Sequence, residues 1–387
     1  MSAPDTASHA LPYWRLSSFY FFYFAVVGTL MPFWGLYLQS LSFSAQEIGI
    51  VSAIMMATRI VAPSLWGWLG DRTGKRLAII RLGSFLACLC FLIIFFTEDF
   101  WPIALAVAAY SFFWNAVLAQ FEVISLGYLG NQPHRYSRIR LWGSVGFVLV
   151  VAGLGWLFDW LSIRYLPFVA IGFLVCIWLS HFTIREQPLP HVPPSKGDLW
   201  RVLKQPAVIA FLLSSCLLQV SHGAYYTFYS VYLESLDYSR SAIGILWALG
   251  VVAEVLIFII MPRWFEWLSL RRIMIFTLVV TVVRWWLIGC YADSLTVLLI
   301  AQLLHAFSFG SAHAVAIELI RRFFSGSVHG QGQALYSAAS FGLGGALGAF
   351  ISGMVWGASP VLAFAISAFA AALALWLVWR YLHMVEL

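Results

Sequence analysis

Apolar stretches of about 20 residues recur along the whole chain, and this feature constrains the fold more than any other. Hydrophobic residues make up 62% of the 387 positions and charged residues only 10%, against about 45–50% and about 25% in soluble domains. A helix of about 20 apolar residues spans the hydrocarbon core of a bilayer. Uninterrupted apolar runs favour helices over the alternating segments of a barrel. The sequence therefore predicts an all-α integral membrane protein.

Twelve transmembrane helices are expected. Their predicted ranges are 14–38, 47–69, 77–97, 102–127, 139–158, 164–184, 206–233, 241–262, 273–291, 295–319, 331–355 and 359–382. The only long polar stretch, rich in proline, lies between the sixth and seventh ranges. We therefore predict an N-terminal six-helix bundle over 1–184, a cytoplasmic linker over 185–205 and a C-terminal six-helix bundle over 206–387.

The basic residues predict the orientation of these helices. All Lys and Arg residues except Arg59, Arg164, Arg240 and Arg284 fall on the side that holds both termini. Lys and Arg are enriched in the cytoplasmic loops of membrane proteins. We therefore expect a multi-pass protein of the cytoplasmic (inner) membrane with both termini in the cytoplasm. The net charge of +6 is then a topology signal, which predicts contact with the lipid bilayer and no binding of nucleic acid.

An internal repeat relates the two halves. Residues 37–50 read YLQSLSFSAQEIGI and residues 232–245 read YLESLDYSRSAIGI, so the end of the first helix returns at the end of the seventh. Parallel six-helix halves are typical of transporters that bind substrate near the midplane between them. The repeat thus favours a secondary transporter.

The loop after the second helix contains Gly67, Asp71, Arg72, Gly74, Lys75 and Arg76. These residues can form a tight turn and a charge cluster that controls the conformational switch. Their pattern resembles the major facilitator signature, which implies a major facilitator fold.

A narrower resemblance lies in RIRLWGS at 138–144 and LHAF at 304–307. Both segments are similar to the phenylpropionate permease branch, near lactose permease and the nucleoside proton symporters. The resemblance implies that Glu122 and Arg140 bind substrate, because they occupy the places of the sugar-binding acid and arginine of lactose permease. A purely structural salt bridge is the alternative.

The same resemblance places Arg284 and His305 where lactose permease has its helix 9 arginine and helix 10 histidine. The glutamate that carries the proton in lactose permease is replaced here by Ser308. Ionisable residues inside a membrane are functional candidates by default. Glu254, Arg284 and His305 fall at one depth in adjacent helices, so we predict that they form a proton-coupling network. A static buried pair that fixes helix packing is the alternative.

Other polar and aromatic residues have more ordinary interpretations. Arg59 in the second helix could attract an anionic substrate, or it could snorkel or pair with a neighbour. Trp142 and Trp114 are candidates for stacking on a substrate ring, although membrane tryptophans commonly pack or lie at interfaces. His222 and His313 are interpreted as hydrogen-bonded interior histidines.

We therefore predict a proton-coupled symporter that imports a small organic solute by alternating access. An aromatic carboxylate such as phenylpropionate is the favoured substrate, and nucleoside or sugar proton symport and drug efflux are the alternatives. The chain lacks H-E-x-x-H, G-x-S-x-G and phosphate-loop motifs, which argues against an enzyme. We expect no cofactor other than the proton gradient, no metal site, and function as a monomer.

Overall fold

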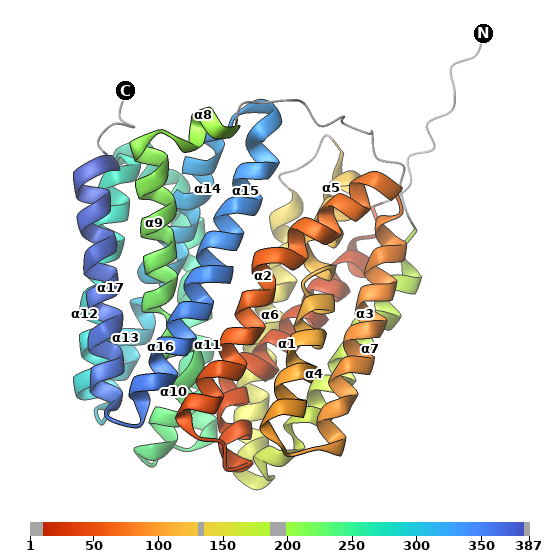
Figure 1. The fold of residues 1–387 in the computed structure, drawn as a ribbon, viewed down its shortest axis with the longest axis vertical. Helices are drawn as coiled ribbons and strands as arrows, with labels where there is room; N and C mark the ends of the chain where they lie inside the picture. The colour runs from red at the N-terminus through yellow and green to blue at the C-terminus, as the bar shows by residue number, and fades with distance from the viewer. Residues whose placement is uncertain (1–10, 131–134, 186–198, 383–387) are drawn as a thin grey trace.

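The computed structural model describes residues 11–130, 135–185 and 199–382, and every regular element within these ranges is a helix (Figure 1). Twelve segments are long and apolar enough to cross a membrane. The first six comprise α1 (Tyr13–Ser40), α2 (Ala45–Thr73), α3 (Arg76–Leu92) with η1 (Ile93–Phe96), α4 (Phe100–Trp114) with α5 (Val117–Leu129), α6 (Tyr136–Trp160), and η3 (Ile163–Tyr165) with α7 (Leu166–Ser180) and η4 (His181–Thr183).

The short helix α8 (Leu199–Leu203) precedes the second six segments. These comprise α9 (Pro206–Ser221) with α10 (Gly223–Ser235), α11 (Arg240–Trp267), α12 (Leu270–Tyr291), α13 (Leu295–Leu303) with η5 (Ala306–Ser311) and α14 (Ala312–Phe323), α15 (His329–Ser337) with η7 (Ala338–Gly344) and α16 (Gly345–Trp356), and α17 (Pro360–Tyr381). The single-turn helix η6 (Gly326–Val328) precedes α15. The twelve predicted membrane helices are confirmed. The predicted linker over 185–205 lies largely outside the described residues, so the domain boundaries stay a prediction.

One predicted helix end is wrong. The eighth helix was expected to stop at residue 262, whereas α11 continues to Trp267 with Pro262 inside it. A proline forgoes one backbone hydrogen bond, and membrane helices tolerate this loss where neighbouring groups satisfy the freed carbonyl. The proline therefore marks no boundary here.

Local signals explain both ends of α2. The Ser44 hydroxyl accepts a hydrogen bond from the Glu47 amide, and the Glu47 carboxylate accepts one from the Ser44 amide, so a capping box starts the helix. Gly74 ends it in the left-handed region, at φ +67°, a conformation that glycine adopts without steric cost. The chain then turns directly into α3.

The first six and the second six segments lie side by side and meet most closely at one end of the molecule (Figure 1). We call this the far end; it holds the ends of α1 and α6 and the starts of α2 and α11. The opposite end, where α2 ends and α3 begins, is called the basic end. A Cβ atom built on Gly49 of α2 would lie 2.6 Å from the Cα of Gly353 in α16. Such contact requires glycine on both helices.

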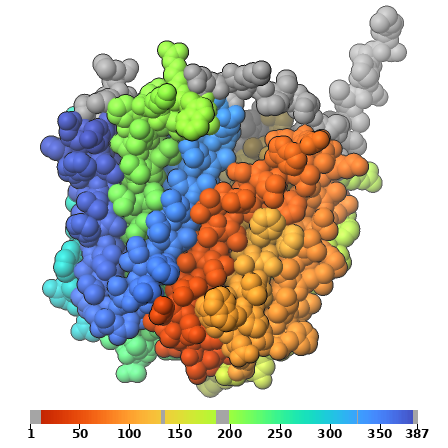
Figure 2. Space-filling view, in the orientation of Figure 1, coloured from red at the N-terminus to blue at the C-terminus, as the bar shows by residue number. Residues whose placement is uncertain are grey.

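Three further contacts hold the two halves together at the far end. A Cβ on Gly155 of α6 would lie 3.2 Å from the Cα of Gly244 in α11, and one on Gly35 of α1 would lie 2.7 Å from the Thr227 carbonyl oxygen of α10. Arg240 also donates a hydrogen bond to the Phe158 carbonyl, 3.0 Å away across the two halves. In Figure 2 the surfaces of α2 and α16 meet along a diagonal seam. The halves are thus closed together at the far end.

Candidate functional site

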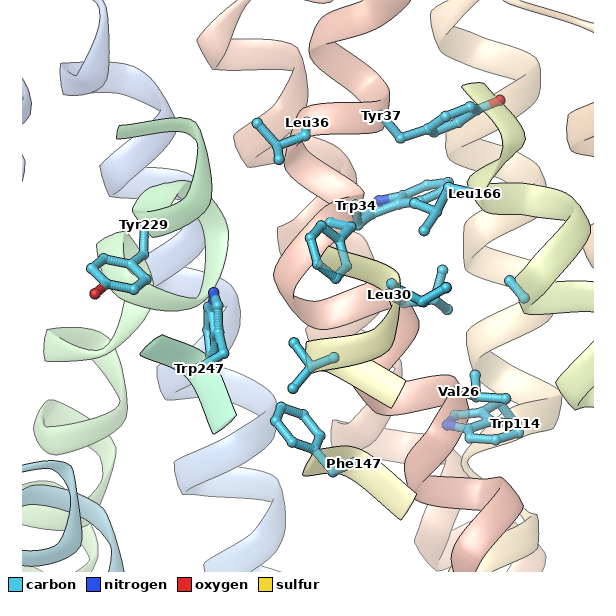
Figure 3. Close-up of a cluster of buried hydrophobic side chains, with 14 of the residues drawn as sticks. Val26, Leu30, Trp34, Leu36, Tyr37, Trp114, Phe147, Leu166, Tyr229 and Trp247 are labelled. Carbon is cyan, nitrogen blue, oxygen red and sulfur yellow. The ribbon is translucent and has the colours of Figure 1, made fainter. Parts of the chain in front are cut away.

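A cavity lies between the halves at the depth of the middle of α2, and we call it the central cavity. Side chains from α1, α2, α4 and α10 line it: Val26, Val27, Leu30, Met31, Trp34, Gly35, Ser52, Met55, Met56, Arg59, Tyr110, Ser111, Trp114, Asn115, Tyr226 and Thr227. Figure 3 shows part of this wall, with Trp114 beside Val26 and with Leu30 and Trp34 following along α1. An apolar, aromatic wall with a few polar groups is typical of small-molecule sites.

Arg59 supplies the positive charge of the central cavity. It lies 14 residues into α2, about 21 Å along the helix axis, and it is half-buried. Among the described residues it has no hydrogen-bond or ion-pair partner. Three hydrogen-bonded polar side chains lie beside it. Asn115 donates to the Thr58 hydroxyl at 2.9 Å, and Thr58 donates to Ser111 at 3.1 Å. A free guanidinium in such a place favours an anionic ligand.

Aromatic rings form one wall of the central cavity. The rings of Tyr23 and Trp114 stack at 4.3 Å with an interplanar angle of 9°, and Trp114 and Tyr110 lie 5.9 Å apart. Trp114 and Tyr110 line the central cavity together with Arg59. The aromatic wall and the Arg59 guanidinium therefore belong to one cavity.

Glu122 and Arg140 lie nearer the basic end than Arg59. Glu122 accepts a hydrogen bond from the Tyr136 hydroxyl at 3.1 Å, and the Arg140 guanidinium lies 3.9 Å from the centre of the Phe24 ring. The two charges interact electrostatically, but within the described part of the chain they form no ion pair at 4.0 Å or less. Neither charge is neutralised by direct contact with the other.

Trp142 has a different environment. Its indole nitrogen donates to the Tyr13 hydroxyl at 3.0 Å, and its ring makes an edge contact with Trp14. It is not among the described residues that line the central cavity, whereas Trp114 is. Of the two tryptophans weighed from the sequence, Trp114 has the better position for stacking on a ligand.

Glu254 and His305 come together as the sequence predicts. The Glu254 carboxylate lies 3.7 Å from Nε2 of His305, and their side chains are 18% and 7% exposed. No Lys or Arg of the described ranges lies within 4.0 Å of this carboxylate. An interior carboxylate beside one histidine is an arrangement that can bind and release a proton.

Arg284 belongs to the neighbouring set of contacts and does not pair with Glu254. Its guanidinium is fully buried and donates to the Ala301 carbonyl at 2.9 Å, to Ser308 at 3.1 Å and to Gln302 at 3.3 Å. It also lies 4.3 Å from the centre of the Tyr225 ring. Neutral oxygens and an aromatic face thus stabilise this cation. Ser308, which occupies the position of the proton-carrying glutamate in the lactose permease resemblance, is one of the direct partners of Arg284.

The signature loop has a partner that the sequence did not reveal. Arg76 forms an ion pair with Asp71 and also donates to Gln120 of α5. A Cβ on Gly70 would lie 2.5 Å from the Gln120 oxygen, so the glycine lets α2 approach this amide. Gln120 is almost fully buried, and it lies two residues before Glu122 in α5. The loop is therefore attached to a helix that carries a predicted substrate-binding residue.

Comparison with known proteins identifies the family. Residues 13–366 match the model of the MFS_1 like family. The "Probable 3-phenylpropionic acid transporter" of Escherichia coli (strain K12) is 31% identical over 333 residues, which cover 84% of this chain and 86% of that protein. A maltose permease of Geobacillus stearothermophilus is 24% identical and covers 84% of this chain and 83% of its own length.

A solved structure of a mutant form of the nucleoside transporter NupG has a TM-score of 0.87. It is 17% identical and covers 95% of this chain and 99% of that protein, so this likeness concerns the fold alone. Twelve membrane-spanning segments, the fold and the sequence relatives agree with one another. The chain belongs to the MFS_1 like family and is a multi-pass membrane transporter of the major facilitator superfamily, not an enzyme.

Proposed function

We propose that the protein imports a small aromatic carboxylate together with a proton. The observation that carries this proposal is the guanidinium of Arg59, which has no ion-pair partner among the described residues and lies in the aromatic-walled central cavity. A carboxylate can take two parallel hydrogen bonds from an arginine, while the attached ring stacks on Trp114 or Tyr110. The sequence relative whose name specifies 3-phenylpropionic acid supports this substrate class.

The proposed orientation rests on the positive-inside rule, by which the basic loops favour a cytoplasmic location for the basic end and the inner membrane for the protein. In this orientation the far end, where glycine contacts hold the halves together, faces outward, which favours an inward-facing state. The charges that serve substrate and proton lie in different halves, with Arg59, Glu122 and Arg140 in the first and Glu254 and His305 in the second. A rocking motion of the halves can therefore couple them.

Nucleosides and sugars are the alternative substrates, because relatives named for a nucleoside and for maltose share the fold or the sequence. A comparison of ligands distinguishes them. We expect purified protein to bind 3-phenylpropionate at least about tenfold more tightly than the matching neutral amide, since a charged hydrogen bond contributes about 1.5–3 kcal/mol. Calorimetry with both compounds, uridine and maltose measures this preference. Tighter binding of uridine or maltose than of the acid would contradict the proposal.

We also propose that Asp71 and Arg76 control the conformational switch and do not touch substrate. Asp71 lies 12 residues beyond Arg59, about 18 Å along α2. Asp71→Asn removes the negative charge that pairs with Arg76, so we expect turnover to fall by roughly an order of magnitude while the dissociation constant of the substrate stays within about twofold. Uptake rates and calorimetry measure the two effects. Asp99→Asn, an exposed change at the far end, is the control. A large loss of affinity with normal turnover would refute this role.

A further inference from the structure

The second half contributes two neighbouring side chains to the wall of the central cavity, Tyr226 and Thr227 of α10. The other described residues that line this cavity belong to the first half. Thr227 lies where the halves touch, because a Cβ atom on Gly35 of α1 would lie 2.7 Å from its carbonyl oxygen. This close approach holds α10 against α1 and brings Tyr226 of the second half into the same cavity as Arg59.

The Tyr226 hydroxyl is available to a ligand. It forms no hydrogen bond with the described residues, whereas on the same helix Tyr225 donates to Gln302 at 3.0 Å and Tyr232 donates to a carbonyl oxygen of α12 at 3.2 Å. The Tyr229 hydroxyl also has no partner in the described part of the chain, but it is buried, and Tyr229 is not among the described residues that line the central cavity. Tyr226 thus combines an unpartnered O–H group with a place in the cavity wall.

The ring that carries this hydroxyl is held by the second half. It stacks on His222 at 5.4 Å with an interplanar angle of 27°, and its centre lies 6.5 Å from that of Trp247 at an angle of 21°. His222 is itself fixed, because its Nδ1 forms a hydrogen bond with the Leu218 carbonyl oxygen at 2.8 Å. A donor on a packed ring loses little conformational freedom when a ligand binds, so more of its interaction with the ligand remains as affinity.

A bound carboxylate needs more donors than Arg59 alone supplies. Its two oxygens offer about four lone-pair positions, and one guanidinium occupies two of them with parallel hydrogen bonds. Tyr110 presents a hydroxyl to this cavity from the first half, where it lies beside Trp114 in the aromatic wall. The Tyr226 hydroxyl is a neutral donor from the second half in the same cavity. It can satisfy a remaining lone pair that would otherwise be unpaired, a loss that costs affinity.

We propose that the Tyr226 hydroxyl donates a hydrogen bond to the substrate carboxylate that Arg59 holds, so that one ligand connects the two halves. This inference rests on the proposed function, which places the carboxylate at Arg59. The Tyr226 ring packs against Trp247 of α11, and Glu254 lies about two turns further along that helix. The contact therefore joins the substrate site to the helix that carries the proposed proton site.

The test is Tyr226→Phe, which keeps the stacked ring and removes only the hydroxyl. We expect the dissociation constant for 3-phenylpropionate to rise by about tenfold, because hydrogen bonds to charged groups are the stronger ones. The constant for the neutral 3-phenylpropanamide should rise less, by about threefold, since its oxygen carries no full charge. Calorimetry with both ligands measures these changes. Tyr232→Phe makes the same substitution on α10 at a residue outside the described cavity wall, and this control should bind both ligands like the wild type.

A double variant separates a ligand contact from a structural role. If both side chains bind one carboxylate, their losses are not independent, and Tyr226→Phe should cost at most about twofold once Arg59→Ala has released the carboxylate. Wild-type affinity in Tyr226→Phe would overturn the inference. A loss that is equal with and without Arg59 would show that the hydroxyl acts through the fold, and would overturn it as well. Normal affinity in Arg59→Ala alone would instead refute the proposed function, and the role of Tyr226 would fail with it.

Discussion

Replacing Glu254 by Gln is expected to abolish proton-driven accumulation of substrate while substrate exchange continues. A carboxylate near the middle of a membrane helix is costly, and uptake of a proton removes that cost by removing the charge. Glutamine keeps the shape of the protonated side chain but cannot release a proton. Because His305 is the only ionisable partner found within 4.0 Å in the described ranges, no fixed cation there holds Glu254 permanently ionised.

The pH gradient determines how far the wild type can accumulate substrate. A pH difference of one unit is worth about 1.4 kcal/mol per proton and supports about tenfold accumulation. Wild-type vesicles should approach this ratio, and the Gln variant should only equalise substrate across the membrane. Uptake under an imposed pH gradient is measured beside counterflow without one. Glu266→Gln, an exposed change on the same helix α11, is the matched control. Accumulation by the Glu254 variant would assign coupling to another group, with His305 the next candidate.

The membrane helices were predictable because the thickness of the bilayer sets their length and its apolar interior sets their composition. A run of apolar residues has few other stable environments, so twelve runs became twelve spans. The error at Pro262 and the helix breaks near Asn115 and His222 were not visible in the local sequence pattern. Asn115, for example, donates its side-chain amide to Thr58 of α2. Such a partner 57 residues away leaves no trace in the local pattern.

The candidate site was predictable in its residue types and less so in its pairs. Charges within apolar runs pointed to Glu254 and His305, which do meet. The expected approach of Arg284 to Glu254 is absent from the described contacts, because Arg284 is satisfied by a serine, a glutamine and a backbone carbonyl. Partners of this kind carry no charge and do not stand out in an apolar sequence. Gln120 was missed for the same reason.

Arg59 is the other residue at which a single change should have a large effect. We expect Arg59→Ala to weaken binding of 3-phenylpropionate by about 10- to 100-fold, because a hydrogen bond to a charged group contributes about 1.5–3 kcal/mol. Arg59→Lys keeps the charge but loses the planar guanidinium that can donate to both carboxylate oxygens. The affinity of this variant for 3-phenylpropionate should therefore lie between those of the wild type and Arg59→Ala. The helix itself should tolerate either change, since Arg59 makes no hydrogen bond or ion pair to other described residues.

The decisive readout is the preference for the acid over its amide. If Arg59 holds the carboxylate, the Ala variant should bind 3-phenylpropionate and 3-phenylpropanamide almost equally, since the interaction that separates them is gone. A variant that is merely misfolded would lose both ligands together. Arg138→Ala removes the same charge from an exposed position in α6 and should keep the wild-type preference. Calorimetry on the four proteins measures these affinities. An Arg59→Ala variant that still prefers the acid at least tenfold would place the carboxylate elsewhere, with Arg140, stacked on Phe24 and free of a direct ion pair, as the cation to replace next.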